Sequence, residues 1–213
     1  MKLLLSSRKA RRYGNFSIES YFNGLSVFFN KKGEVNHWKS PLISNGFFPR
    51  IWSIIALART VLKYKPNVTH VTGDVHFLMW GIPIGKRVLT IHDVGFLRGA
   101  TGLRYRILRY FWLTGPVKRA DVVTCVSSST KMEILYHLKK PCPINVIPTS
   151  IDPRFKPRIK QFNNKRPTIL MLGSAPNKNV HRVLSATKHL NVIYRNLFMT
   201  EENKALLYLG SFG

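Results

Sequence analysis

Acidic residues, cysteines and long apolar runs are all scarce in this sequence. Only 9 Asp and Glu oppose 34 Lys and Arg among 213 residues, which leaves a formal net charge of +25. Such an excess of positive charge predicts an anionic partner: nucleic acid, anionic lipid or a phosphorylated substrate. No stretch approaches the ~18 consecutive apolar residues of a bilayer-spanning helix, so we expect none.

The amino-terminal residues and the cysteine count favour a reduced, cytoplasmic protein, peripheral at most on the inner face of a membrane. Residues Met1–Leu5 are too short for the apolar region of a signal peptide, and the basic segment Arg8–Arg12 follows rather than precedes them. The two cysteines, Cys125 and Cys142, match no metal-ligand spacing. We expect Cys125 to be a small buried apolar residue.

Short apolar runs alternate with longer amphipathic ones, which predicts an α/β fold with a Rossmann-like, doubly wound parallel sheet. Because helices cover both faces of such a sheet, its strands are nearly continuous apolar runs. The predicted strands are Lys2–Ser6, Glu34–Trp38, Val68–Val71, Arg87–Ile91, Asp121–Val126, Ile144–Ile147 and Thr168–Leu172. The predicted helices are Ile18–Phe29, Ile51–Leu62, Leu103–Leu113, Thr130–Leu138 with a Thr130/Glu133 capping box, and Asn179–Leu190.

A proline-rich stretch divides the chain. Residues Pro148–Pro157 contain three prolines and cannot form a regular helix or a central strand. We predict a first domain over 1–150, a linker over 151–166 and a second Rossmann-like domain over 167–213. Only 46 residues follow Pro167, whereas a doubly wound half needs well over about 100, so the second domain is expected to be incomplete.

Ligands of open parallel sheets bind beyond the carboxyl ends of the strands, and four polar segments follow predicted strands. The basic loop 6–15, with Gly14 and Asn15, suits a phosphate but also reads as a solvated turn. His92 and Asp93 can bind a sugar hydroxyl or stabilise charge, although a lone histidine is often structural. The hydroxyls of 127–130 can bind an anion or simply cap a helix.

The fourth polar segment is Gly173–Asn179, between a predicted strand and a predicted helix. A tight turn, a helix amino terminus and Lys178 suit a diphosphate, although Lys178 does not follow a glycine as in a Walker loop. Elsewhere, the segment Arg98–Arg119 interleaves six basic residues with aromatic ones and contains no acid. This pattern suits an anionic membrane or, with lower rank, nucleic acid, and a core-packed helix with a basic outer face accounts for it too.

Four motifs follow one another in a recognisable order: Val88–Asp93, Lys118–Ser127, Ile144–Pro157 and Leu170–Asn179. Together they resemble the family-4 glycosyltransferases of the GT-B fold, over residues 1 to about 190. The resemblance implies two facing Rossmann-like domains that transfer a sugar, with retention, from a nucleotide-sugar to an acceptor glycan or a lipid-linked or cell-surface glycan precursor. It implies no metal and no other cofactor.

The resemblance also implies roles for individual residues. His92, with Asp93 beside it, would contact the transferred sugar, Lys178 would stabilise the leaving diphosphate, and both would face one cleft. The basic aromatic helix would dock on the membrane. The expected donor-binding residues are Gly14, Asn15, Gly173, Ser174, Lys178 and Asn179; Ser127 is expected near the acceptor; Arg104, Arg106, Arg109 and Trp112 are expected to face the membrane.

Some positions depart from the family pattern. Thr149 and Ser150 replace the usual Asn-Gly, and Ser174 stands where an arginine is common. The usual pair of glutamates seven residues apart has no match, because Glu201 and Glu202 are adjacent. We therefore expect a truncated donor domain with impaired transfer. The alternative, from another class, is a non-catalytic basic module that binds anionic membrane or RNA.

Overall fold

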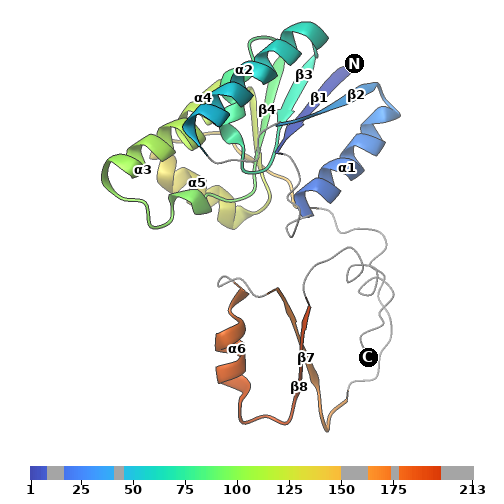
Figure 1. Ribbon diagram of the computed structural model, residues 1–213, viewed down its shortest axis with the longest axis vertical. Coiled ribbons are helices and arrows are strands. Elements are labelled where there is room, and N and C mark those ends of the chain that lie inside the picture. Colours follow the sequence, from blue (N-terminus) through green and yellow to red (C-terminus); the bar gives the residue numbers. More distant parts are fainter. Residues whose placement is uncertain (9–16, 41–45, 150–162, 174–177, 198–213) are drawn as a thin grey trace. The chain divides into compact units, whose positions relative to one another are not determined.

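The computed structural model describes residues 1–8, 17–40, 46–149, 163–173 and 178–197. The described residues form two separate units: the first extends through residue 149, and the second comprises 163–173 and 178–197 (Figure 1). The predicted positions Gly14, Asn15 and Ser174 lie outside the described residues, as does most of the predicted linker 151–166. The two units are therefore described one at a time.

The first unit contains a six-stranded sheet in the order β2-β1-β3-β4-β5-β6. Every pairing is parallel, for example Leu5 with His70 and Thr90 with Thr124, which confirms the predicted Rossmann-like α/β fold. All of its predicted strands form, with ends shifted by one residue at most. Their bounds are β1 (Lys2–Ser7), β2 (Glu34–Lys39), β3 (Val68–Val71), β4 (Lys86–Ile91), β5 (Val122–Cys125) and β6 (Asn145–Val146).

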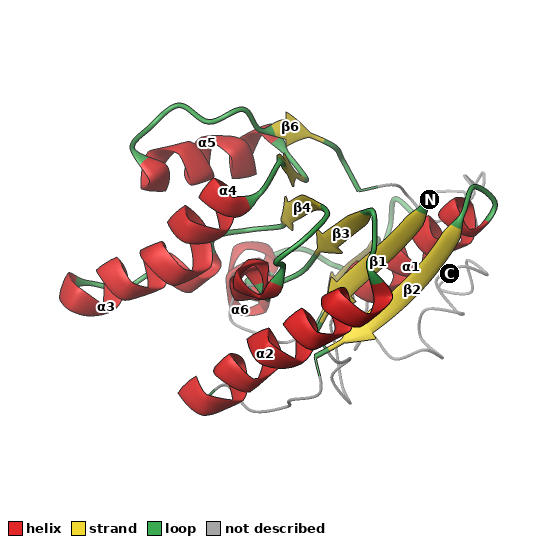
Figure 2. Cartoon of the chain, turned by 90° about the horizontal axis from the view of Figure 1, so that it is seen from above, coloured by secondary structure: helices red, strands yellow, loops and turns green. Residues whose placement is uncertain are grey.

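Helices cover both faces of this sheet, with α1 on one side and α2 and the α3–α4 helix on the other (Figure 2). On the α2 side, Leu4, Leu89 and Ile91 join Leu57 and Val61 of α2 in one core, each with no exposed surface. Leu57 and Val61 are four residues apart, so one face of α2 is buried. The helices are α1 (Ser17–Asn30), α2 (Phe47–Tyr64), η1 (His76–Gly81), η2 (Gly95–Leu97), α3 (Gly102–Leu108), α4 (Gly115–Arg119) and α5 (Ser128–Leu138).

A π-helical segment, η3 (Arg109–Thr114), joins α3 to α4, so the predicted helix 103–113 is longer and less regular than its pattern suggested. The amide of Gly115 donates to the carbonyl of Tyr110, five residues back, rather than to that of Phe111. The Phe111 carbonyl instead accepts from the indole Nε1 of Trp80, at 3.2 Å. The shift in hydrogen bonding thus ties the helix to η1, a 3₁₀ segment that the sequence pattern did not predict.

The second unit is a strand–helix–strand motif. Strands β7 (Thr168–Leu172) and β8 (Ile193–Leu197) pair in parallel, and helix α6 (Val180–Thr187) connects them. The hydroxyl of Tyr194 donates to the carbonyl of Thr187 at 3.1 Å, which ties β8 to the end of α6. Strand β7 agrees with the predicted range, whereas β8 was not predicted.

Candidate functional site

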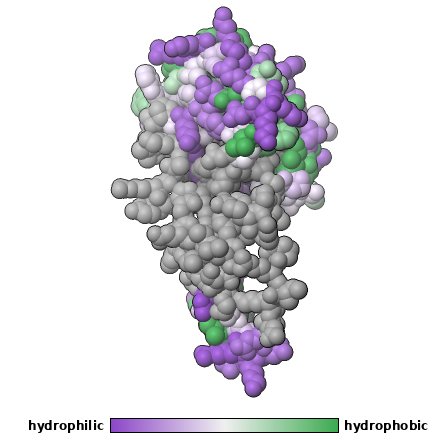
Figure 3. Space-filling model, turned by 90° about the vertical axis from the view of Figure 1, so that its right-hand side faces the viewer, coloured by the Kyte–Doolittle hydropathy of each residue, from purple (hydrophilic) through white to green (hydrophobic). Residues whose placement is uncertain are grey.

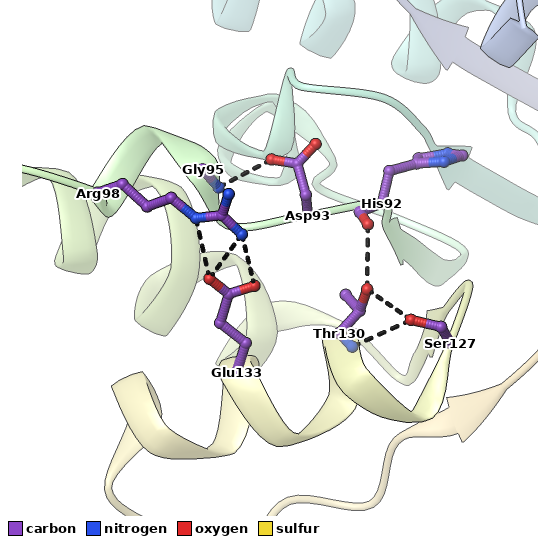
Figure 4. A network of polar contacts seen from close by, with 7 residues as sticks. All are labelled: His92, Asp93, Gly95, Arg98, Ser127, Thr130 and Glu133. Carbon is purple, nitrogen blue, oxygen red and sulfur yellow. Dashed lines mark hydrogen bonds and ion pairs between the residues drawn. The ribbon is translucent and has the colours of Figure 1, made fainter. Parts of the chain in front are cut away.

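Hydrogen bonds of two hydroxyl groups connect the end of β4 to the start of α5 (Figure 4). The Thr130 hydroxyl donates to the carbonyl oxygen of His92 at 3.3 Å, and it lies 2.9 Å from the Ser127 hydroxyl. Ser127 Oγ in turn accepts the backbone N–H of Thr130 at 3.1 Å, so Ser127 is the N-cap of α5. The helix amino terminus thereby holds the backbone of His92 at the carboxyl edge of the sheet.

The capping box predicted at Thr130 and Glu133 is wrong. The cap begins three residues earlier, at Ser127, because the helix starts at Ser128. The Glu133 carboxylate accepts instead from the guanidinium of Arg98, with Nη2 at 3.1 Å from Oε1 (Figure 4). This ion pair joins the segment after η2 to α5.

The side chains of His92 and Asp93 point in different directions (Figure 4). The imidazole is half-buried and lies edge-on to Phe22 of α1, with ring centroids 6.1 Å apart. Asp93 is exposed, and its Oδ1 accepts the backbone N–H of Gly95 at 2.8 Å, which stabilises the turn into η2. The two residues therefore offer separate chemical groups at this edge rather than a hydrogen-bonded acid–base pair.

A chain of polar side chains lies in the sheet on the face covered by α1. The Thr90 hydroxyl is 2.7 Å from His70 Nε2 and 2.7 Å from the Thr124 hydroxyl, so three adjacent strands are linked. Phe22 closes over His70 at a centroid distance of 5.2 Å. Since the same ring contacts His92, α1 covers both imidazoles.

Burial keeps two histidines near this edge neutral. Desolvation, assisted by the neighbouring His92, lowers the pKa of His70 to about 4. Burial also lowers the pKa of His76, against the opposing effects of its hydrogen bond to Trp112 and of the Asp74 and Asp93 carboxylates. His76 Nδ1 lies 3.0 Å from the Trp112 carbonyl, which can only accept, so Nδ1 carries the proton.

Arg8 and Asp74 form an ion pair, which the sequence pattern did not predict. Arg8 follows β1 and Asp74 follows β3, and their side chains approach to 2.9 Å. Asp74 lies 66 residues along the chain from Arg8, so only the adjacency of β1 and β3 brings them together. Part of the basic charge expected to attract a phosphate after β1 is thus balanced by a carboxylate.

In the second unit the structure brings together Gly173, Lys178 and Asn179. Gly173 has φ +83°, a conformation that side chains disfavour, and the Lys178 side chain packs over its α-carbon. Asn179 precedes α6 in the left-handed conformation and makes no side-chain cap. The first backbone N–H groups of α6 thus donate no hydrogen bond to the Asn179 side chain, and the exposed Lys178 directly precedes that residue.

The four residues expected to face a membrane have different surroundings. Arg104 and Arg106 are exposed on α3. The Arg109 guanidinium instead donates to the last carbonyls of α5, from Nε to His137 at 2.6 Å and from Nη2 to Leu138 at 3.2 Å. Trp112 is half-buried, packed against Phe77 and covered by the Arg50 guanidinium at 4.5 Å from its ring centroid.

Neither a metal-binding cluster nor a membrane-spanning helix is found among the described residues. Within them, no three His, Cys, Asp or Glu side chains are grouped closely enough to hold a metal ion. No helix in the same part of the chain combines the length and the apolarity needed to cross a bilayer.

Two solved structures share the fold of this chain. Over 97% of the chain, the fold is similar to the lipopolysaccharide outer core galactosyltransferase WaaB in its apo form, with a TM-score of 0.51, 10% identity and 71% of that protein covered. A UDP-N-acetylglucosamine 2-epimerase homologue from Listeria monocytogenes, described as putative, matches with a TM-score of 0.50 and 10% identity, over 99% of this chain and 67% of that one. No curated protein sequence matches.

The sheet, its crossover helices and these neighbours define a Rossmann-like α/β protein of the GT-B type. The sequence profile of Glycosyltransferase Family 4 matches residues 23–155, more than half of the chain. The chain therefore belongs to Glycosyltransferase Family 4, as the order of its motifs indicated.

Proposed function

We propose that this protein transfers a sugar from a nucleotide-sugar to an acceptor hydroxyl, with retention at the anomeric carbon and without a metal ion. The observation that carries the proposal is the family match over 23–155, which includes His92 at the carboxyl edge of a parallel sheet. Open parallel sheets bind their ligands at this edge. The acceptor is a glycan or a lipid-linked precursor of a cell-surface glycan.

In the proposed reaction the acceptor oxygen forms the new bond to the anomeric carbon as the bond to the diphosphate breaks. The nucleoside diphosphate leaves with the electron pair, and a phosphate oxygen of this leaving group takes up the proton of the acceptor hydroxyl. His92, with Asp93 beside it, contacts the transferred sugar. Lys178 and the N–H groups at the start of α6 stabilise the negative charge that grows on the departing diphosphate.

The test is a transfer assay with UDP-, GDP- and ADP-sugars and extracted lipid and glycan acceptors, run with and without EDTA. His92→Ala and Lys178→Ala should each lower the rate by about 100-fold, the effect expected for loss of one group that stabilises developing charge. The matched controls are His189→Ala and Lys188→Ala, which remove exposed side chains of the same types. These controls should retain wild-type rates.

Transfer that neither His92→Ala nor Lys178→Ala reduces would overturn the assigned roles, and transfer abolished by EDTA would overturn the metal-free mechanism. A folded chain that transfers from no donor would favour the second candidate function, a non-catalytic basic module. Its net charge of +25 supports that candidate. Vesicle flotation and salt-titrated RNA binding then identify which polyanion it holds.

A further inference from the structure

The imidazole of His76 is a polar group inside the first unit, whose described surface is mainly hydrophilic in the view of Figure 3. His76 lies in η1 and is 1% exposed. Its Nδ1 has the Trp112 carbonyl as a partner, whereas Nε2 is buried and has no hydrogen-bond partner among the described residues. Because an unpaired buried polar atom costs stability, an apolar side chain would serve folding better at this position. The histidine therefore indicates a role other than stability.

The carbonyl that holds His76 depends on a side-chain donor. In an α-helix the Trp112 carbonyl would accept the backbone N–H four residues further on, but that residue is Pro116, which has no N–H. The chain adopts π-helical hydrogen bonding just before this proline, over Arg109–Thr114, and such segments are frequent at functional sites. The bond from Nδ1 of His76 supplies the missing donor at 3.0 Å, and it fixes the tautomer and the direction of the ring.

The second contact of the His76 ring leads toward the candidate site. Phe96 of η2 packs edge-on against it, with ring centroids 5.8 Å apart and an interplanar angle of 73°. Phe96 follows Gly95, whose N–H donates to Oδ1 of Asp93 at 2.8 Å (Figure 4). Asp93 is also close enough to act on the pKa of His76, which burial lowers and the Asp93 carboxylate raises. The imidazole thus lies against the turn that begins at Asp93.

Helix α5 holds the two ends of this turn, at the His92 carbonyl and at the Arg98 guanidinium (Figure 4). Neither of these contacts involves the middle of the turn. There the backbone and the carboxylate are in close contact, because a Cβ atom at Gly95 would lie 3.0 Å from Oδ1 of Asp93. A displacement of Phe96, the next residue, therefore also displaces the carboxylate.

We propose that His76 is a positioning residue for sugar transfer: anchored on the Trp112 carbonyl, its ring supports Phe96 and so sets the direction of the Asp93 carboxylate. His76 itself does not touch the substrate. A group displaced by about 1 Å from its productive position can lower the rate by about 100-fold, so support from outside the site affects catalysis. This inference rests on the proposed function, in which Asp93 contacts the transferred sugar.

The first test is a double-mutant cycle in the transfer assay. His76→Leu removes the anchored ring and Phe96→Leu removes the ring that it supports. Each should lower kcat about tenfold and leave the KM of the nucleotide-sugar within about twofold. The double variant should also lose about tenfold, because both substitutions break the same chain of contacts. The matched controls His189→Leu and Phe48→Leu change exposed residues and should keep the wild-type kcat.

The second test is amide hydrogen exchange, measured by NMR without any substrate. The backbone N–H groups of Gly95 and Thr130 each donate to a side-chain oxygen, at 2.8 and 3.1 Å, so both should exchange slowly. His76→Leu and Phe96→Leu should each speed exchange at Gly95 at least tenfold. Exchange at Thr130, which caps α5 on the other side of the turn, should not change.

Unchanged exchange at Gly95 would overturn the proposal, and so would losses of kcat that multiply to about 100-fold in the double variant. If the wild-type chain transfers no sugar, the proposed function fails, and the exchange rates still decide whether His76 positions Asp93. Circular dichroism checks that each variant folds. If the buried substitution His76→Leu unfolds the chain, Phe96→Leu, at a half-buried position, decides by kcat and by exchange at Gly95.

Discussion

Gly115 lies against the indole ring of Trp80 so closely that no side chain fits between them. A Cβ atom at position 115 would sit 2.2 Å from Cζ2 and 2.8 Å from Cη2 of Trp80, and 3.0 Å from the Tyr110 carbonyl oxygen. The close approach lets Trp80 donate to the Phe111 carbonyl that the π-helical register leaves free. One glycine thereby lets η1 pack against the helix formed by α3, η3 and α4.

We therefore expect Gly115→Ala to destabilise the first unit by about 1–3 kcal/mol, the usual cost of overpacking. Gly24→Ala is a matched control, because a Cβ at Gly24 in α1 has nothing within 4 Å. The control should be neutral or stabilising by up to about 1 kcal/mol through helix propensity. Urea unfolding followed by circular dichroism measures both. An equal response of the two variants would show that Trp80 moves aside at little cost.

Arg109 should contribute to stability although it lies in a basic, aromatic segment. Arg109→Gln removes the guanidinium donors to the His137 and Leu138 carbonyls and should cost about 1–2 kcal/mol of unfolding free energy. Arg104→Gln, at an exposed position on the same helix, should change it by less than about 0.5 kcal/mol. The comparison is made by chemical denaturation at one salt concentration. If Arg104→Gln lowered the unfolding free energy more than Arg109→Gln, the Arg109 guanidinium would lie in solvent rather than against α5.

Stability should fall in mild acid because of His70. Its folded-state pKa of about 4 lies below the reference value of 6.5, so the unfolded chain takes up a proton first. The stabilisation is complete above pH 6.5 and is lost as the pH falls to about 4, by up to about 3 kcal/mol. His70→Gln should flatten part of this slope. His37, His76 and His137, whose pKa values are also lowered, contribute to the remaining slope. An unchanged slope in His70→Gln would mean that His70 is accessible to protons in the folded protein.

Among the described residues, Asp93 makes a structural contact through Oδ1 and has no hydrogen-bond partner for its second carboxylate oxygen. Two substitutions separate the roles of these two oxygens. Asp93→Asn keeps an oxygen that accepts the Gly95 N–H, so the unfolding free energy should stay within about 0.5 kcal/mol; Asp93→Ala should lose about 1 kcal/mol. If the charge acts on the substrate, as we propose, Asp93→Asn should still lower transfer at least tenfold. Unchanged transfer in Asp93→Asn would leave Asp93 as a turn residue alone.

Local apolar patterns were sufficient to predict most of the sheet. Strands β3 and β7 agree residue for residue with Val68–Val71 and Thr168–Leu172, because buried parallel strands are short apolar runs with clear polar ends. The segment η1 was missed because its residues Phe77–Trp80 form an unbroken apolar run, with no period to indicate a helix. Strand β8 was missed because its five residues mix apolar Ile193 and Leu197 with Arg195 and Asn196.

The order of elements and the position of His92 at a strand end follow from the amino-acid sequence by itself, since each depends on residues close together in the chain. Which side chains meet depended on tertiary structure. Arg8 reaches Asp74, Arg109 caps α5, and Arg50 of α2 covers the Trp112 ring of η3, all between residues at least 28 apart in sequence. Such contacts arise from the crossover geometry of the sheet, which no local periodicity encodes.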